Sequence, residues 1–319
     1  MTLAVVCASH TPLMYRGPAN TGTEARVRTA LEDLAGMVRR YEPDFIIQFA
    51  PDHFNGFFYD MMPPFCVGAG AESLGDWGGS IGPLDVPEDT ALALVEHLRA
   101  DDFDIALSYR MPVDHGFVQM WDAMLGGCRS LPIVPVFVNA AAPPLPTYRR
   151  ARRLGESVGR FAVRTGKRVL IAASGGLSHD PPMPSIRNAP APLRERLING
   201  RNPSPQARQA REKRVLEAGA LAEAGKGPCK PLNPAWDADV MDILRSGQVW
   251  RADAWDTDGV REVAGCGANE ALCWVAAFAA LSMAGRFEME HEFYEAIPAW
   301  IAGFATMAAR QVDVARQPR

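Results

Sequence analysis

The fold of this chain is most constrained by short apolar runs that alternate with amphipathic helical patterns. The runs have the length of buried strands, and the patterns between them are long enough to carry the chain back across a sheet. Strands are predicted at residues 3–8, 44–50, 105–107, 132–138 and 168–173, and helices at 23–40, 87–100, 148–165 and 268–283. This order is typical of βα units. The sequence therefore predicts one α/β domain over residues 1–319, with a central, mostly parallel sheet flanked by helices.

Charge and composition exclude several classes of protein. Charged residues make up 22% of the 319 residues and the net charge is −4, so there is no overall basic charge to attract nucleic acid or an anionic membrane. The six cysteines include no C-x-x-C pair, and neither a structural zinc site nor a redox dithiol is expected. The first apolar run ends at once in Ser9 and His10, unlike a signal peptide. These features predict a soluble, cytoplasmic protein.

Residues 194–230 depart from the alternating pattern. They are rich in Arg, Ala and Glu, and they contain Pro203 and Pro205. We interpret this segment as a charged, solvated helical excursion within the domain. A lid over a site and a contact between subunits are the alternatives.

Four of the six histidines follow predicted strands, and their placement is the most informative feature for function. His10, His53 and His179 come shortly after strands, and His115 follows residues 105–107 by a loop. The carboxyl ends of parallel strands lie at one edge of a sheet, so the loops that leave them converge on one crevice. We therefore expect these four side chains to meet in space.

Three of these histidines have an aspartate as a direct neighbour, namely Asp52, Asp114 and Asp180. A carboxylate near a histidine can accept a ring N–H and so fix the tautomer and orientation of the imidazole. The other two histidines, His97 and His291, lie beside glutamates in patterns typical of exposed surface.

Histidines grouped with a carboxylate, and without cysteines, indicate a mononuclear metal site with nitrogen and oxygen ligands. Two His and one Asp or Glu on one face of Fe(II) leave positions open for other ligands, the usual arrangement in non-haem oxygenases. Zinc hydrolases use similar ligands. The ligand types alone leave both metals open.

The segments around these residues together resemble the class III extradiol ring-cleavage dioxygenases. The motifs that carry the likeness are residues 9–13, 49–60, 113–117 and 174–179. The likeness continues through residues 62–66, 231–234, 274–280 and 297–304, and it weakens only in 194–230 and at the carboxyl end. It is greatest to family members that act on 2,3-dihydroxyphenylpropionate and 2,3-dihydroxycinnamate.

The resemblance implies a ligand set for Fe(II). His10 and His53 match the iron-binding histidines of the family, and Glu270 matches its glutamate at the start of the last long helix. Glu262 is a rival carboxylate because it lies nearby in the sequence, and Asp52 is a rival because it precedes His53.

The resemblance also implies the reaction. A catechol would be opened next to its two hydroxyls with both atoms of O₂ inserted, giving a ring-opened hydroxy-oxo-dienedioate in aromatic catabolism. His115 and His179 match the acid–base pair of the family, and an imidazole can take either role near neutral pH. We hypothesise that His179 is the base and His115 the acid. A homo-oligomer is expected, with no nucleic acid or membrane partner.

Such a substrate carries a carboxylate on its side chain, which should meet a cation or a nest of backbone N–H groups. Arg16, Arg110 and Arg187 lie near the loops at the strand ends, and nothing in the sequence selects one of them.

Two other function classes stay open from the sequence. One is a zinc- or iron-dependent hydrolase built on the same ligands, which metal content and oxygen uptake with a catechol would distinguish. The other is a non-catalytic binding protein with the same fold, and the presence of four site histidines argues against it.

Overall fold

The computed structural model describes residues 3–14, 16, 19–128 and 131–312. Its strands are β1 (Leu3–Ala8), β2 (Phe45–Ala50), β3 (Phe65–Gly68), β4 (Ala71–Leu74), β5 (Ile81–Pro83), β6 (Ala106–Ser108), β7 (Met111–Val113), β8 (Ile133–Val138), β9 (Val169–Ser174), β10 (Phe287–Ile297) and β11 (Ala302–Gln311). Its α-helices are α1 (Thr21–Tyr41), α2 (Glu88–Ala100), α3 (His115–Leu125), α4 (Tyr148–Thr165), α5 (Ala191–Asn199), α6 (Pro205–Glu223), α7 (Pro234–Arg245), α8 (Thr257–Ala264) and α9 (Ala271–Ser282). Short 3₁₀ helices are η1 (Asp76–Gly78), η2 (Val249–Ala254), η3 (Ala268–Glu270) and η4 (Pro298–Trp300).

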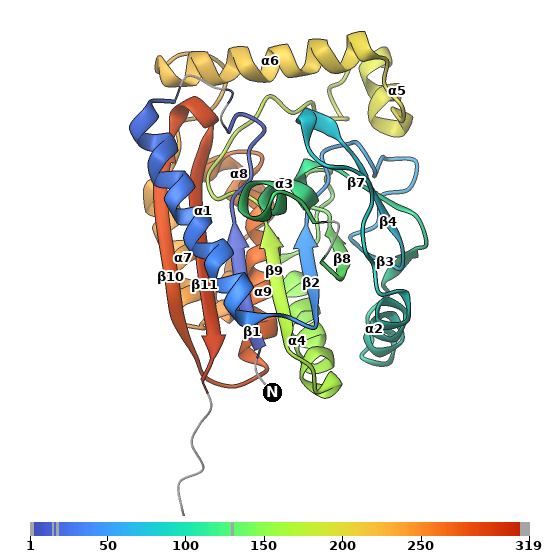
Figure 1. Cartoon of the computed structure of the whole chain (residues 1–319). Coiled ribbons are helices and arrows are strands. Elements are labelled where there is room, and N and C mark those ends of the chain that lie inside the picture. Colours follow the sequence, from blue (N-terminus) through green and yellow to red (C-terminus); the bar gives the residue numbers. More distant parts are fainter. Residues whose placement is uncertain (1–2, 15, 17–18, 129–130, 313–319) are drawn as a thin grey trace, which may run out of the picture.

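An eight-stranded sheet in the order β10-β11-β1-β9-β2-β8-β3-β6 forms the centre of the molecule (Figure 1). Its four middle strands, β1, β9, β2 and β8, are parallel to one another. Every residue of these four strands is buried, as expected of parallel strands covered on both faces. The predicted α/β domain with a mostly parallel central sheet is confirmed.

Helices cover both faces of the sheet because successive strand residues point to opposite sides. In β1, Val5 and Cys7 belong to the core that contains α4 and α9, whereas Ala4 and Val6 belong to the core beneath α1 and α3. Helix α9 is apolar around its whole circumference and almost completely buried, because it lies between the sheet and α4.

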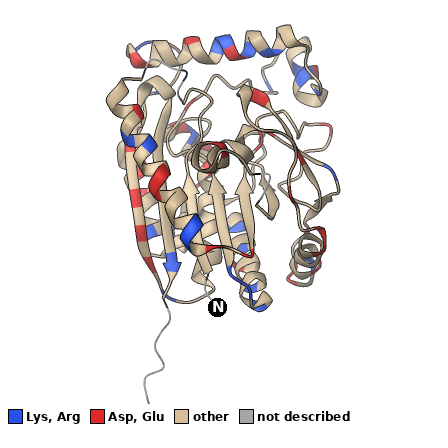
Figure 2. Cartoon of the chain, viewed as in Figure 1, with Lys and Arg blue, Asp and Glu red and all other residues tan. Residues whose placement is uncertain are grey.

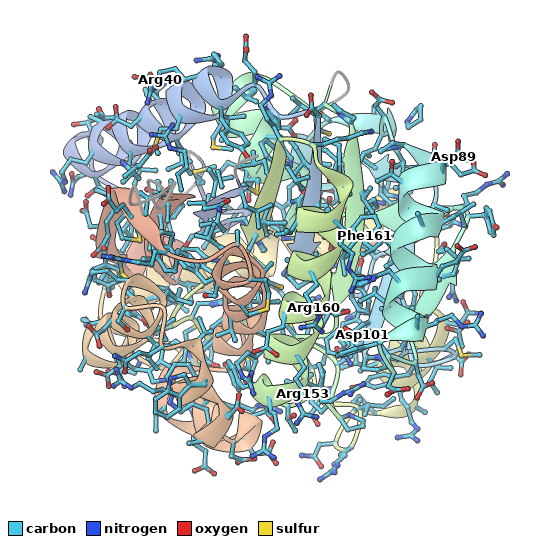
Figure 3. All side chains as sticks on the ribbon, turned by 90° about the horizontal axis from the view of Figure 1, so that it is seen from below. Arg40, Asp89, Asp101, Arg153, Arg160 and Phe161 are labelled. Carbon is cyan, nitrogen blue, oxygen red and sulfur yellow. The ribbon has the colours of Figure 1, made fainter. Side chains whose placement is uncertain are left out.

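The close approach of α4 to α9 depends on glycine. A Cβ at Gly155 would stand 2.0 Å from the carbonyl oxygen of Ala276, so any larger residue would push the helices apart. Seen from below, α4 lies beside α2, where the labelled side chains of Arg160 and Asp101 form an ion pair (Figure 3). This contact ties the end of α2 to the helical layer.

Three parts of the sheet structure were not predicted. The first is β3, which pairs with β8 in antiparallel fashion. Strands β10 and β11 form an antiparallel hairpin that joins the sheet beside β1. The sequence of β11 is dominated by small residues instead of the β-branched residues typical of strands, whereas β10 alternates apolar Phe287 and Met289 with glutamates in a period-two pattern. A separate three-stranded sheet has the order β5-β4-β7.

The charged segment 194–230 is largely helical, as predicted, and contributes most of α5 and all of α6. Helix α6 runs across the molecule beyond the carboxyl ends of β1, β9 and β2 (Figure 1). It is anchored near its end, where Ala218 and Gly219 are buried and the helix contacts η4. The interpretation of the segment as a simple solvated excursion is therefore wrong for its inner face. Among the residues described, no helix is long and apolar enough to cross a membrane.

Candidate metal centre and active site

The four predicted histidines converge beyond the carboxyl ends of the middle strands, together with Glu270. His10 follows β1 by two residues, His53 follows β2 by three and His179 follows β9 by five. Because β9 lies between β1 and β2 in the sheet, these three loops leave from adjacent positions. Glu270 is the last residue of η3, immediately before α9.

His115 reaches the site by a different route from the one predicted. It does not follow an end of the central sheet directly, because β6 is succeeded by β7 of the smaller sheet, and His115 is then the first residue of α3. The side chain is nevertheless close to the others. The ring centroids of His53 and His115 lie 4.4 Å apart in a stacked arrangement.

Nε2 of three histidines lies close to the carboxylate of Glu270. Nε2 of His53 is 3.1 Å and Nε2 of His179 is 3.3 Å from Oε1, and Nε2 of His10 is 3.7 Å from Oε2. The Nε2 atoms of His10 and His53 are 3.4 Å apart. Adjacent ligands of a six-coordinate ion with metal–ligand bonds of about 2.1 Å are about 3.0 Å apart. Two imidazoles and one carboxylate at these separations fit a divalent metal ion on one face.

A second set of potential ligands includes His115. The ring nitrogens offered by His10, His53 and His115 all lie within 4.8 Å of one another. This group contains no carboxylate to offset the charge of a dication. We therefore take His10, His53 and Glu270 as the better-fitting set.

The two alternative carboxylate ligands, Asp52 and Glu262, do not point to a metal site in the structure. Asp52 accepts hydrogen bonds from the backbone N–H groups of Asn55, Gly56 and Phe57, so it stabilises its own loop. Glu262 is exposed on the surface. The carboxylate of Glu270, in contrast, is buried, and its Oε2 accepts the N–H of Gly176 at 2.8 Å.

All four imidazoles direct Nε2 toward the centre because each Nδ1 has a partner elsewhere. Nδ1 of His10 lies 2.8 Å from Oγ of Ser174, that of His53 lies 3.1 Å from Asp114 and that of His179 lies 2.9 Å from the carbonyl oxygen of Leu177. Nδ1 of His115 lies 2.6 Å from Oδ2 of Asp76. A carbonyl or carboxylate acceptor places the proton on Nδ1, which leaves the lone pair of Nε2 for a metal or a substrate proton.

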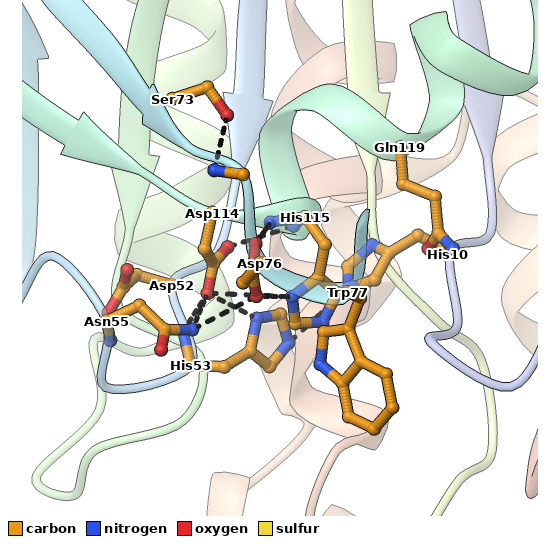
Figure 4. A network of polar contacts seen from close by, with 12 residues as sticks. His10, Asp52, His53, Asn55, Ser73, Asp76, Trp77, Asp114, His115 and Gln119 are labelled. Atoms are coloured by element: carbon orange, nitrogen blue, oxygen red, sulfur yellow. Dashed lines mark hydrogen bonds and ion pairs between the residues drawn. The ribbon is translucent and has the colours of Figure 1, made fainter. Parts of the chain in front are cut away.

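The carboxylates that orient His53 and His115 are not their sequence neighbours (Figure 4). Asp114 is next to His115 in the chain, but it serves His53, and its Oδ2 lies 3.9 Å from Nδ1 of His115. Asp76, from the glycine-rich loop before β5, serves His115 and also accepts its backbone N–H at 2.8 Å. Of the three aspartates next to histidines in the sequence, Asp114 thus orients a histidine, whereas Asp52 and Asp180 accept backbone N–H groups. Asp76 was not anticipated.

The remaining two histidines lie outside this site, as expected, but they are not surface residues. Nε2 of His97 lies 3.0 Å from the carbonyl oxygen of Ser157, and Nε2 of His291 lies 2.7 Å from Oγ1 of Thr306. Both side chains are partly buried. Their role is to link neighbouring elements.

Burial and mutual charge set the protonation states of the site. Burial lowers the pKa of His10 to about 3. Burial alone would raise the pKa of Glu270, but His179 and His10 hold it well below its usual value. Burial alone would lower the pKa of His53, but Asp114 and Glu270 raise it well above its usual value. A proton on His53 thus balances two buried carboxylates, and a divalent cation could supply that positive charge instead.

The site forms the floor of a cavity of about 470 Å³, a size ordinary for small-molecule pockets. Phe54 and Trp77 contribute to its wall, and residues of α5 and α6 form its roof. Arg16, Arg110 and Arg187, the cations near the strand-end loops, are not among the described residues that line it. A Cβ at Gly267 would stand 2.0 Å from Nε2 of His179, so glycine is needed there for the imidazole to reach the cavity.

Comparisons with known proteins show which proteins this chain is similar to. Three bacterial proteins named 2,3-dihydroxyphenylpropionate/2,3-dihydroxicinnamic acid 1,2-dioxygenase are similar over nearly the whole chain. The protein from Cupriavidus pinatubonensis is 47% identical over 98% of this chain and 100% of its own. Those from Photorhabdus laumondii and a Rhodococcus species are each 46% identical, over 98% of this chain and 98% and 100% of theirs.

A solved structure shares the fold. It is that of an uncharacterized protein from Escherichia coli K12, with a TM-score of 0.50 and 14% sequence identity over 97% of this chain and 99% of the other. The family model described as the catalytic LigB subunit of aromatic ring-opening dioxygenase matches residues 4–305. The chain therefore belongs to the family of the catalytic LigB subunits of aromatic ring-opening dioxygenases.

Proposed function

We propose that this protein is an Fe(II)-dependent extradiol dioxygenase that opens 2,3-dihydroxyphenylpropionate or 2,3-dihydroxycinnamate next to the two hydroxyls. Both atoms of O₂ enter the product, a ring-opened hydroxy-oxo-dienedioate. The observation that carries the proposal is the convergence of Nε2 of His10, Nε2 of His53 and the carboxylate of Glu270 in a cavity that also holds two further imidazoles. The names of the similar bacterial proteins support the choice of substrate.

His10, His53 and Glu270 would hold the metal ion. Two neutral imidazoles and one carboxylate on one face suit non-haem Fe(II). An Fe(II) ion held by these residues would supply a redox-active Lewis acid at which a catechol and O₂ can react.

His179 is placed to accept a proton from the catechol. Its Nδ1–H donates to the carbonyl oxygen of Leu177, and its Nε2 lies 3.3 Å from Oε1 of Glu270. With Glu270 bound to a metal ion, the lone pair of Nε2 would be free to accept a substrate proton. A base beside the metal ligands would let the substrate bind as its anion, since binding through both oxygens requires the loss of at least one proton.

His115 also lies beside the ligand group, with its ring centroid 5.4 Å from that of His10 and 4.4 Å from that of His53. Asp76 holds the ring through both its backbone N–H and Nδ1. In this position His115 can donate a proton to an oxygen that departs during ring opening. The division into base and acid is part of the proposal.

Phe54 and Trp77 exclude water from part of the cavity wall and offer flat surfaces for an aromatic ring. The family resemblance further supports a homo-oligomer located in the cytoplasm. Both of these remain predictions.

The proposal is tested with protein prepared without oxygen, loaded with Fe(II) and mixed with 2,3-dihydroxyphenylpropionate before oxygen is admitted. We expect uptake of one O₂ per substrate and the appearance of a yellow ring-opened product. Protein loaded with Zn²⁺ should consume no oxygen. Absence of oxygen uptake by the iron-loaded protein with either catechol would rule the proposal out, and activity with Zn²⁺ on an ester or amide would indicate a hydrolase.

A further inference from the structure

Arginines from α5, α6 and the loop between them form much of the roof of the active-site cavity. Five of them line it: Arg196, Arg201, Arg208, Arg211 and Arg214. Figure 2 shows lysine and arginine segments along α6 and on α5, beyond the strand ends. The roof is therefore lined by cationic side chains, whereas histidines and carboxylates line the floor.

One of these arginines has a carboxylate partner. The guanidinium of Arg201 binds both carboxylate oxygens of Asp60, at 2.6 and 3.0 Å. Its charge is thus already balanced within the protein.

The other four, which we call the roof cluster (Arg196, Arg208, Arg211 and Arg214), form no ion pair with any carboxylate in the described part of the chain. Arg211 is partly buried and donates to two uncharged oxygens, Oδ1 of Asn55 at 2.9 Å and the carbonyl of His53 at 2.8 Å. Glu212 is the single acidic residue of α6 among the described residues that line the cavity. Positive charge is therefore in excess at the roof.

The cationic side chains of the roof cluster lie close enough to affect one another. Partial burial, followed by the charges of Arg214 and Arg211, lowers the pKa of Arg196. Clustered like charges destabilise the protein unless an anion offsets them. A cluster of arginines without carboxylate partners in the protein, facing a substrate cavity, is the arrangement that recognises a carboxylate or a phosphate.

The position of α6 is fixed at two points. Arg211 ties the middle of α6 to the loop that carries His53, and the buried Gly219 lies against η4 near the helix end. Arg208 and Arg211 are three residues apart and so share one face of the helix. The roof is thus a preformed surface at a set distance from the metal ligands.

We propose that the roof cluster binds the carboxylate of the substrate side chain, with Arg196 and Arg214 as its direct partners and Arg211 positioning α6 over the site. This inference rests on the proposed function, because it places the catechol hydroxyls at the histidine floor and the propionate or acrylate chain toward the roof. It assigns the preference for catechols with an acidic side chain to the segment 194–230, and not to Arg16, Arg110 or Arg187.

The test compares two substrates of similar size. One is 2,3-dihydroxyphenylpropionate, and the other is 3-propylcatechol, which lacks the carboxylate. For the iron-loaded full-length chain, the ratio of kcat/KM for the acid to kcat/KM for the neutral catechol should be high. In the double variant Arg196→Gln, Arg214→Gln this ratio should fall by about 10- to 100-fold, the size expected for the loss of charge-assisted hydrogen bonds.

Lys213→Gln is the matched control. Lys213 lies on the same helix and carries the same charge, but it pairs with Glu217 and is not among the lining residues. This variant should keep the ratio within about twofold, since exposed charges contribute little. Arg196→Lys should recover part of the ratio, because a lysine keeps the charge but not the planar geometry of the guanidinium.

A second measurement does not depend on turnover. Calorimetric titration should show that the unaltered protein binds 3-phenylpropionate more tightly than 3-phenylpropan-1-ol, and the Arg196→Gln variant should lose this difference. An unchanged substrate ratio in folded variants, or equal affinity of the unaltered protein for the acid and the alcohol, would overturn the inference. Failure of the unaltered protein to open either catechol would instead defeat the proposed function.

Discussion

Oδ2 of Asp114 lies 3.1 Å from Nδ1 of His53 and 2.9 Å from the backbone nitrogen of the same residue. The same oxygen accepts the side-chain N–H of Asn55 at 2.8 Å, and the other carboxylate oxygen accepts the N–H of Gly116 at the start of α3. One carboxylate thus connects the loop after β2 to α3. It fixes the imidazole of His53 with Nε2 toward Glu270, so the geometry of the proposed metal site depends on a residue that is not itself a proposed ligand.

We expect Asp114→Asn to weaken Fe(II) binding by about 10- to 100-fold, the usual effect of removing a carboxylate that orients a metal-binding histidine. The four groups around Asp114 are all donors, so the amide N–H₂ of asparagine must face at least one of them. Titration of the metal-free variant with Fe(II), without oxygen, measures the loss. Asp85→Asn changes an exposed aspartate and should bind iron as the unaltered protein does. Unchanged affinity in Asp114→Asn would show that backbone geometry alone orients His53.

Much of this site could be predicted from the sequence. His10, His53 and His179 follow strands that are recognisable as apolar runs, and the topology of parallel sheets brings such loops together. Glu270 could be proposed only from the family resemblance, because a buried glutamate before an apolar helix has no distinctive local pattern.

The contacts between loops could not be predicted. Whether Asp114 serves His115 or His53 depends on the backbone path at the start of α3, where Asp114 is the N-cap residue. Asp76 lies in a loop whose sequence does not indicate that its carboxylate binds His115. The roof arginines were missed because a charged helix looks the same in sequence whether it faces solvent or a cavity.

We expect Glu270→Gln to abolish tight Fe(II) binding and turnover together. The change keeps the size of the side chain but removes the negative charge, so only the two imidazoles would remain as anchors for the dication. Metal analysis after gel filtration, with oxygen uptake measured on the same sample, tests this. Glu262→Gln should retain both metal and activity. Loss of metal and activity in Glu262→Gln but not in Glu270→Gln would identify Glu262 as the carboxylate ligand.

Variants of the histidines should distinguish residues that bind the metal ion from residues that transfer protons. His10→Ala removes a proposed ligand and should lower iron content and turnover together. His115→Gln and His179→Gln should keep iron and lose about 10²- to 10⁴-fold in rate, the usual effect of removing a positioned proton-transfer group. Iron analysis and steady-state rates on the three variants are the measurements. A glutamine variant that loses iron as completely as His10→Ala would identify that histidine as a ligand.

The two glutamine variants should also differ from each other. Without the base, binding of the catechol as its anion should weaken or need a higher pH, whereas without the acid the anion should bind but ring opening should stall. Ultraviolet titration with substrate in the absence of oxygen distinguishes these outcomes. Equal loss of anion binding in both variants would contradict the division of roles.

The last prediction concerns Asp180, which anchors the loop after His179. Its carboxylate accepts the backbone N–H of Cys266 at 2.8 Å and that of Lys230 at 3.0 Å. Partial burial would raise the pKa of Asp180, but these hydrogen bonds, first that from Cys266 and then that from Lys230, lower it below the ordinary value of 3.8. The charged form is therefore the one that the folded protein favours.

A carboxyl whose pKa is lower in the folded than in the unfolded state stabilises the fold at pH values above its unfolded pKa, and this stabilisation declines as the pH falls through that value toward the folded pKa. Asp180→Asn should thus reduce the free energy of unfolding by about 1 kcal/mol at pH 7, a figure that allows for the partial exposure of the group. The difference should be constant between about pH 7 and 5 and shrink below about pH 4. Urea unfolding of both proteins across this range is the measurement, with Asp239→Asn on the exposed face of α7 as a control expected to stay within about 0.5 kcal/mol. A difference that grows as the pH falls would mean that the loop binds the neutral carboxyl, and the account of this anchor would be wrong.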